Sequence, residues 1–132
     1  MQPLTMTDVT IKTTTELQSA EAPGVPEGQF RFAGGSLGVQ AFGMNLLTLP
    51  PNWDGYPKHD HGADGHEEVY VVLEGSGTLQ VGERSWPLHK GTFVRVGPAE
   101  VRKILPGASG IQVLALGGSP GKAYTPSWGQ QR

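Results

Sequence analysis

The chain has 132 residues, with 10 lysines and arginines against 12 aspartates and glutamates, and a formal net charge of −2. This length suits one domain, and the near-neutral charge lacks the basic surface that a nucleic-acid partner requires. No cysteine occurs, which excludes disulfides, thiolate zinc sites, iron–sulfur clusters and cysteine nucleophiles. Any metal must therefore bind through nitrogen and oxygen.

The sequence contains no segment long enough to span a membrane as a helix. The longest strongly apolar run lies within Val69–Leu73, far short of the roughly 20 residues that a bilayer helix needs. The first residues include Asp8, Lys12 and Glu16 and lack the basic start and apolar core of a secretory signal. We therefore expect a cytoplasmic protein without a membrane partner.

Glycine and proline interrupt the chain at short intervals. They make up 31 of the 132 residues, about 23%, roughly double the ~12% of average proteins. Long helices are therefore excluded. Residues 1–30 are expected to form an arm, in which the β-prone segment Val9–Thr15 could add an edge strand and Glu16–Ala22 could form one helical turn. A partly ordered arm is the equal alternative.

Residues 31–118 are expected to form one β domain, followed by an irregular tail over 119–132. Apolar and β-branched runs of five to eight residues are bounded by glycine or proline, and many short strands at regular spacing predict a sandwich or barrel. Val81–Arg84 is typical of a tight hairpin, and Gly107–Gly110 is expected to form another turn. The expected strands are Phe30–Ala33, Leu37–Leu49, Lys58–His61, Glu68–Glu74, Gly77–Val81, Arg84–Leu88, Thr92–Val96, Arg102–Leu105 and Ile111–Leu116.

Three of the four histidines, His59, His61 and His66, lie within ten residues together with Glu67 and Glu68. Side chains at positions i and i+2 of a strand share a face, so His59 and His61 are expected to point the same way. Glu68 enters the next strand and can approach both imidazoles across an antiparallel pair, while Glu67 alternates outward. Two imidazoles and one carboxylate suit a divalent first-row metal and leave coordination positions open.

This cluster resembles a known family motif. The segment His59-Asp60-His61, followed by Glu68 and then, after six residues, by Gly75, resembles the first motif of the cupins. The resemblance covers about residues 43–118. It implies the cupin double-stranded β-helix, a conical jelly-roll barrel in which the metal ligands point into the mouth. It also implies a homodimer, since small cupins commonly assemble through edge strands.

The second cupin motif is matched less completely. Pro87–Gly91 and Val94–Ala99 resemble this motif, which opens with a glycine and normally ends in a fourth metal-binding histidine. Arg102 stands at the position of that histidine. An arginine offers no lone pair to a cation, so the usual fourth ligand is missing.

Two outcomes of this replacement are open. In the first, His59, His61 and Glu68 hold the metal alone, and Arg102 binds an anionic ligand through a bidentate contact. In the second, the guanidinium takes over the electrostatic role of the metal and pairs with Glu68.

Further candidates surround these residues. The loop between His61 and Glu68 has six residues where the family has three or four, which brings His66 close to the site as a fourth ligand, an acid or base, or a solvated loop residue. Tyr70 shares the inward face of Glu68 and could bind a ligand, carry a proton or fill the barrel core. Trp53 and Tyr56 could form a lid, or a surface loop packed by its own aromatics.

We therefore predict a small cupin that binds a divalent metal ion (Fe, Mn, Ni or Zn) and a small anionic organic ligand. Arg102 and Tyr70 are the substrate-binding candidates, and Tyr70 and His66 are the catalytic candidates. An open three-ligand site could support oxygenation or isomerisation. The alternative is a non-catalytic metabolite-binding cupin without a metal, in which Arg102 pairs with Glu68.

Overall fold

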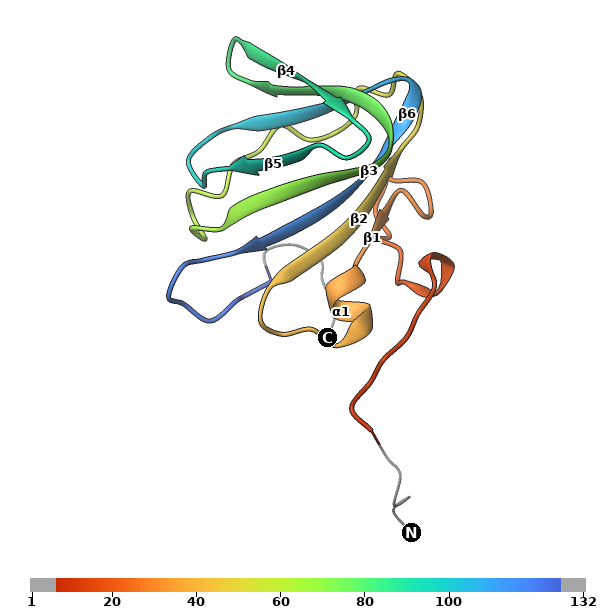
Figure 1. The fold of residues 1–132 in the computed structure, drawn as a ribbon, viewed down its shortest axis with the longest axis vertical. Helices are drawn as coiled ribbons and strands as arrows, with labels where there is room; N and C mark the ends of the chain where they lie inside the picture. Colours follow the sequence, from red (N-terminus) through yellow and green to blue (C-terminus); the bar gives the residue numbers. More distant parts are fainter. Residues whose placement is uncertain (1–6, 127–132) are drawn as a thin grey trace.

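A computed structural model of the chain describes residues 7–126, so the outermost parts of the predicted arm and tail, 1–6 and 127–132, lie outside the described residues. The fold is built from antiparallel strands, as predicted, with one short helix, α1 (Ala33–Leu37). Figure 1 shows the strands curving around one another, with the N-terminal segment projecting from the body. The strands are β1 (Phe30–Arg31), β2 (Gly43–Leu49), β3 (Glu67–Val81), β4 (Arg84–His89), β5 (Phe93–Val96) and β6 (Arg102–Gly118).

Two long strands, β3 and β6, organise the jelly-roll barrel. They pair with each other antiparallel along most of their length. The first half of β3 also pairs with β5 and the second half with β4, whereas the end of β6 pairs with β2, which pairs with β1. The same pair of strands therefore has different neighbours in its two halves. Most buried side chains of both halves form one core, and a smaller cluster contains Leu17, Ala33 and Leu46.

Glycines allow β3 and β6 to bend where the two halves meet. The pairing shifts register between Val72 and Glu74 and again between Gly75 and Gly77. Gly75 has φ +76°, and Gly110 opposite has φ +75°, a left-handed region that favours glycine. The prediction of two separate strands on each side, with a turn at Gly107–Gly110, was wrong because these glycines bend a continuous strand instead of ending it.

Successive side chains of β3 face opposite sides of the strand, and every second one lies in the core. Glu68, Tyr70 and Val72 share the inward face, and Val72 is 1% exposed. Large side chains from both halves of the barrel fill the space between them. The core members with under 2% exposure include Leu88, Ile104 and Val113.

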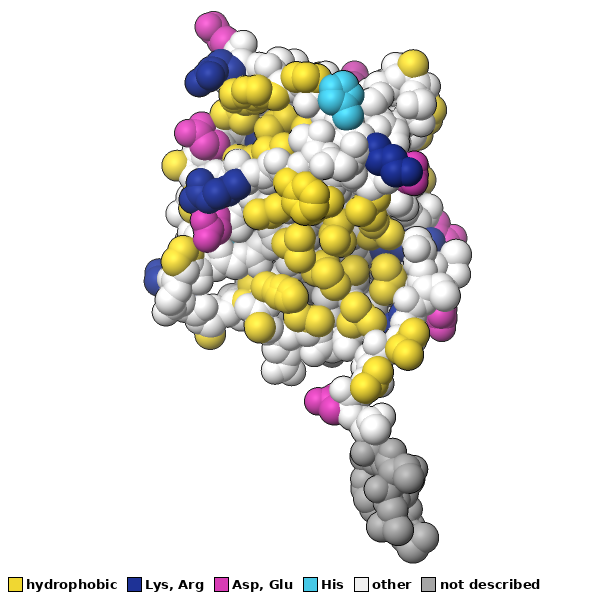
Figure 2. Space-filling model, viewed as in Figure 1, with side chains coloured by type: hydrophobic (Ala, Val, Ile, Leu, Met, Phe, Trp, Pro, Cys, Tyr) yellow, Lys and Arg dark blue, Asp and Glu magenta, His cyan; other side chains and the backbone are white. Residues whose placement is uncertain are grey.

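The outer face of the same strand is apolar too. Val71 pairs in register with Leu114 on one side and with Phe93 on the other, and Phe93 is 73% exposed. Figure 2 shows apolar side chains gathered across the middle of the face that looks toward the viewer. Strand β3 is thus apolar on both faces in its first half, which explains why Val69–Leu73 is the longest apolar run.

The segment before the barrel differs from the prediction. Val9–Thr15 forms no strand, and a 3-10 turn at Thr14–Glu16 is the first regular element of the described chain. Helix α1 occupies the region before β2, so that strand begins at Gly43 and not at Leu37. Neither helical element within residues 7–126 is long and apolar enough to cross a membrane.

The bend at Gly75 generates a stability prediction. A Cβ at Gly75 would collide with the backbone carbonyl of Gly110, in addition to the cost of a positive φ. We expect Gly75→Ala to lower the free energy of unfolding by about 3 kcal/mol or more. The control is Gly82→Ala in the β3–β4 turn, where φ is +60° but nothing lies near the added methyl, and a loss of about 1 kcal/mol is expected. Urea unfolding measures both, and equal losses would contradict the collision.

Candidate functional site

The two motif histidines are fixed on the first residues of β6 and the loop before it. The backbone amide of His59 donates to the carbonyl of Arg102 (3.1 Å), and the amide of Arg102 donates back to His59 (2.9 Å). The amide of His61 donates to the carbonyl of Pro98 (2.8 Å). This is an isolated bridge and not the predicted strand Lys58–His61, but it still places both imidazoles on one side of the segment.

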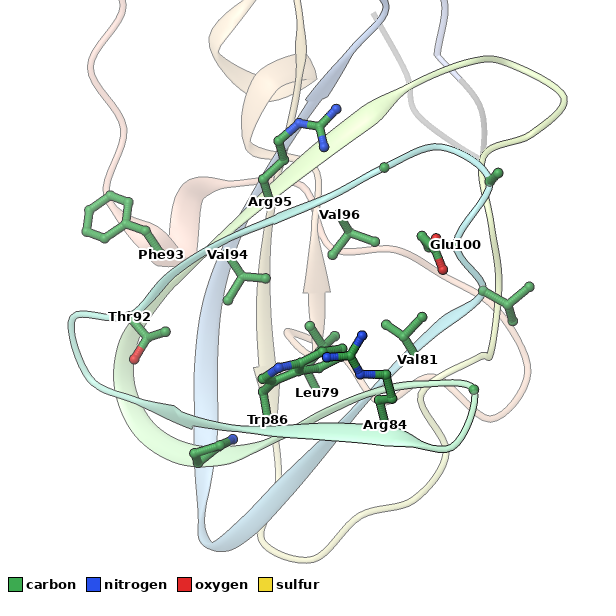
Figure 3. Close-up of a pocket in the computed structure, with 15 residues that line it drawn as sticks. Leu79, Val81, Arg84, Trp86, Thr92, Phe93, Val94, Arg95, Val96 and Glu100 are labelled. Atoms are coloured by element: carbon green, nitrogen blue, oxygen red, sulfur yellow. The ribbon is translucent and has the colours of Figure 1, made fainter.

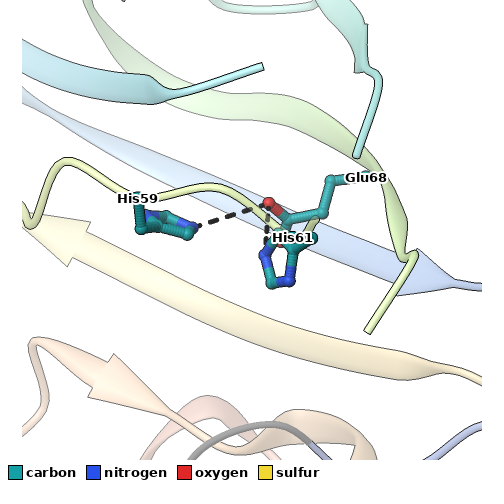
Figure 4. A group of neighbouring side chains, drawn as sticks. All are labelled: His59, His61 and Glu68. Carbon is teal, nitrogen blue, oxygen red and sulfur yellow. Dashed lines mark ion pairs between the residues drawn. The ribbon is translucent and has the colours of Figure 1, made fainter. Parts of the chain in front are cut away.

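Both imidazoles reach one oxygen of Glu68, at the start of β3. His61 Nε2 lies 3.3 Å and His59 Nε2 3.8 Å from Glu68 Oε1, as Figure 4 shows. One ligand atom from each residue lies within 4.8 Å of the others. Two atoms bound to one ion at about 2.1 Å are roughly 3.0–3.4 Å apart. The three groups are therefore arranged closely enough to hold one metal ion.

In each imidazole Nδ1 lies next to a hydrogen-bond acceptor, which leaves Nε2 available to bind a metal. His59 Nδ1 lies 2.9 Å from the carbonyl oxygen of Pro57, and His61 Nδ1 lies 3.1 Å from the carboxylate of Asp64. Both partners can only accept, so in the neutral rings Nδ1 carries the hydrogen and Nε2 has the lone pair. His61 Nε2 is buried and has no hydrogen-bond partner in the described chain, and its lone pair suits a cation.

The carboxylate of Glu68 is held in its ionised form. Burial alone would raise its pKa, but the contacts with His59 and His61 and the hydrogen bond from Tyr70 outweigh this and hold the pKa well below its usual range. The neighbouring Glu68 carboxylate in turn raises the pKa of His61. A metal would consequently compete with a proton for His61 Nε2 and bind less tightly at low pH.

Tyr70 supports this carboxylate. Its hydroxyl donates to Glu68 Oε1 at 2.6 Å and lies 3.2 Å from the hydroxyl of Tyr56. Burial raises the pKa of Tyr70 well above its usual value, so the hydroxyl is a hydrogen-bond donor and not a base at neutral pH. Tyr56 is only 4% exposed. The expectation of a lid or a surface loop at Tyr56 was wrong, because its ring is part of the barrel core.

Arg102 points into the same region and is fully buried, with 0% exposure. Its Nη2 donates to the carbonyl of Gly97 (2.9 Å), and its Nη1 lies 3.9 Å from Glu68 Oε1 without a hydrogen bond. Within residues 7–126, Nε and Nη1 have no hydrogen-bond partner. Buried donors without a partner lower the stability of the fold, and an anion would accept hydrogen bonds from them.

Asp64 is a site residue that the sequence reasoning missed. It lies in the long loop between His61 and Glu68, and that extra length was the available signal. His66 from the same loop is 5% exposed, so the solvated alternative was wrong. Its Nδ1 lies 3.3 Å from the Asp64 carboxylate. His66 thus joins a second group with His61 and Asp64 and not the group around Glu68.

A groove of about 880 Å³ lies between β4 and β5. Figure 3 shows Trp86 of β4 and Val94 and Val96 of β5 lining it. None of the three candidate metal ligands lines this groove. Its wall includes Gly97, whose carbonyl accepts the hydrogen bond from Arg102.

The contact between Tyr70 and Glu68 generates a second prediction. Tyr70→Phe removes a donor to Glu68 and leaves the buried Tyr56 hydroxyl without its partner, so we expect the metal-free protein to lose about 1–3 kcal/mol of stability. Because the folded pKa of Glu68 lies below its ordinary value of 4.5, this loss should persist above pH 4.5 and shrink at lower pH. Urea unfolding across pH measures it. The control, Tyr56→Phe, keeps the bond to Glu68 and should cost less.

Comparisons with known proteins agree with this architecture. No match was found among curated proteins, but the family model described as a cupin domain matches residues 45–105. A cupin protein from Bacteroides fragilis superimposes with TM-score 0.61 at 21% identity, covering 84% of this chain and 91% of that one.

Two further structures carry the description sugar phosphate isomerase. The putative one from Acidithiobacillus ferrooxidans matches with TM-score 0.58 at 27% identity over 67% of this chain. The one from Silicibacter pomeroyi matches with TM-score 0.59 at 21% identity over 74% of this chain. The chain covers 56% and 59% of their respective lengths. Together with the jelly-roll fold, the match shows that this chain contains a cupin domain.

Proposed function

We propose that this cupin binds a divalent metal ion through His59, His61 and Glu68. The observation that carries the proposal is the common orientation of the two imidazoles, whose Nδ1 atoms are held by acceptors while both Nε2 atoms approach one carboxylate oxygen. Two nitrogens and one oxygen suit Fe, Mn, Ni or Zn, and three protein ligands leave positions for a second molecule.

We further propose that this second molecule is a small organic anion bound by Arg102. The guanidinium is buried next to Glu68 and keeps two donor atoms without partners in the part of the chain that the structure describes. Carboxylate and phosphate groups match the planar donor geometry of arginine. The buried position favours a tight, charge-assisted contact over a solvent-screened one.

Phosphorylated sugars are the ligand class that we propose first, with isomerisation as the reaction. The support is the likeness to two structures described as sugar phosphate isomerases and the match between a phosphate and Arg102. A bound metal would act as a Lewis acid on a carbonyl or hydroxyl oxygen of the sugar. In this arrangement Tyr70 keeps Glu68 in place through its hydrogen bond, and Arg102 orients the anionic group.

A second candidate function is a metal-free binding module. The ion pair between Arg102 and Glu68 at 3.9 Å favours it, because the guanidinium already offsets part of the carboxylate charge. The two functions differ in whether metal loading changes the affinity for an anionic sugar.

Metal loading tests the main proposal. The wild-type chain and the double variant His59→Ala, His61→Ala are incubated with Fe(II), Mn(II), Ni(II) or Zn(II), desalted and measured by elemental analysis. We expect stoichiometric metal in the wild type and none above background in the double variant. The control His89→Ala changes an exposed histidine at the end of β4 and should load like the wild type. Equally little metal in all three would favour the binding module.

A further prediction concerns the anion contact. Arg102→Lys keeps the charge but loses the planar fork, so we expect about tenfold weaker binding of fructose 6-phosphate or ribose 5-phosphate by calorimetry. Arg95→Lys is the matched control, because Arg95 is exposed and pairs with Glu67 on the outer face. Circular dichroism checks that both variants fold. Unchanged affinity of Arg102→Lys for both sugar phosphates would remove Arg102 from the ligand site.

A further inference from the structure

We propose that Asp64 is a positioning residue that fixes His61 in the tautomer required for metal binding. The inference rests on the proposed metal site and adds to it a residue from outside the three ligands. Within residues 7–126, Asp64 makes no hydrogen bond or ion pair with Glu68 or His59, and it meets the proposed site through His61. Its contribution would be to decide which ring nitrogen of His61 carries the hydrogen.

The loop holds the Asp64 carboxylate firmly against His61. Both carboxylate oxygens approach His61 Nδ1, at 3.1 and 3.2 Å. The backbone amide of His66 donates to Oδ1 at 3.0 Å, and the hydroxyl of Ser119 donates to the backbone carbonyl of Asp64 at 2.9 Å. The amide of Gly65 closes the loop onto the carbonyl of His61 at 2.7 Å. The carboxylate therefore has a defined position and is not a freely rotating surface group.

His66 restricts the imidazole of His61 from a second direction. The two rings are stacked, with centroids 5.7 Å apart and an interplanar angle of 26°. His66 in turn contacts the ring of Tyr124, with centroids 5.2 Å apart. Rotation of the His61 ring would disturb both the stack and the contact with Asp64, so the ring orientation is fixed together with its tautomer.

The two histidine ligands differ in the partner that orients them. His59 Nδ1 meets the neutral carbonyl of Pro57, whereas His61 Nδ1 meets a carboxylate. A charged acceptor forms the stronger hydrogen bond and increases the basicity of the opposite ring nitrogen. His61 should thus be the stronger metal ligand of the two, and only its tautomer should depend on Asp64.

The same three residues, His61, Asp64 and His66, could instead hold a second ion, since their ligand atoms lie within 4.8 Å of one another. The hydrogen bonds argue against this arrangement. Asp64 Oδ1 is already occupied by the backbone amide of His66, and a metal at His61 Nδ1 would have to displace the hydrogen that leaves Nε2 free for the first site. A positioning role keeps the contacts of Asp64 with His61 and with the His66 amide without that conflict.

The test replaces one carboxylate by an amide. In Asp64→Asn the amide of His66 retains the oxygen at the Oδ1 position, so the new NH₂ group replaces Oδ2, the oxygen nearer to His61 Nδ1, and favours the tautomer with the hydrogen on Nε2. Asp64→Ala removes the bias without inverting it. Asp60→Asn makes the same chemical change on an exposed residue between His59 and His61, whose side chain accepts a hydrogen bond from the Gly62 amide, and is the matched control.

Two measurements read the outcome. Long-range ¹H–¹⁵N NMR of the metal-free protein at pH 8 reports the tautomer of each histidine, and chelator competition with Zn(II) reports the affinity. We expect Asp64→Asn to move the hydrogen of His61 to Nε2, to leave His59 unchanged, and to weaken Zn(II) binding about 10- to 100-fold. The Asp64→Ala variant should lose less affinity, and Asp60→Asn should match the wild type.

The contrary results are distinct. If His61 keeps its hydrogen on Nδ1 in Asp64→Asn, or if that variant binds Zn(II) within twofold of the wild type, the proposal is overturned. Loss of one of two bound ions would overturn it in favour of a second metal site. A further result would be a wild-type chain that binds no Zn(II) while the His61 tautomer still changes in Asp64→Asn. That result would support the positioning role of Asp64 and refute the proposed metal function instead.

Discussion

The site depends on one largely buried carboxylate oxygen, Oε1 of Glu68. A hydroxyl, two imidazoles and a guanidinium surround it, and the closest of them, Tyr70, donates at 2.6 Å. An isolated buried carboxylate would take up a proton, but here the hydrogen bonds prevail over burial. Every element that supplies one of these groups must therefore be placed correctly for the anion to remain buried.

The fold meets this requirement by joining distant segments at one point. Glu68 and Tyr70 come from β3, Arg102 from the start of β6, and His59 is tied to Arg102 through paired backbone hydrogen bonds. The imidazole of His61 is anchored separately, through the loop that contains Asp64. This division matters chemically, because the backbone sets where each ring lies while its hydrogen-bond partner sets which nitrogen can bind a cation.

Part of this arrangement could be predicted from the sequence. Strand alternation places Glu68 and Tyr70 on one face, and the i, i+2 spacing orients His59 and His61, since both rules depend only on local geometry. The continuity of β3 through Gly75 could not be read, because a glycine that bends a strand looks the same in sequence as one that ends it. Asp64 was missed because its role arises from a loop conformation that no periodicity describes.

Strand β3 carries both site residues and core residues, and this limits which mutations the protein tolerates. Loss or gain of one residue between Tyr70 and the bend would reverse the facing of every side chain on one side of the change, since neighbouring residues of a strand face opposite ways. Glu68 and Tyr70 would then turn toward solvent while the apolar outer row entered the interior. Substitutions are thus far easier to accommodate in this strand than insertions or deletions, and the spacing between carboxylate and bend is constrained more tightly than the identity of the residues within it.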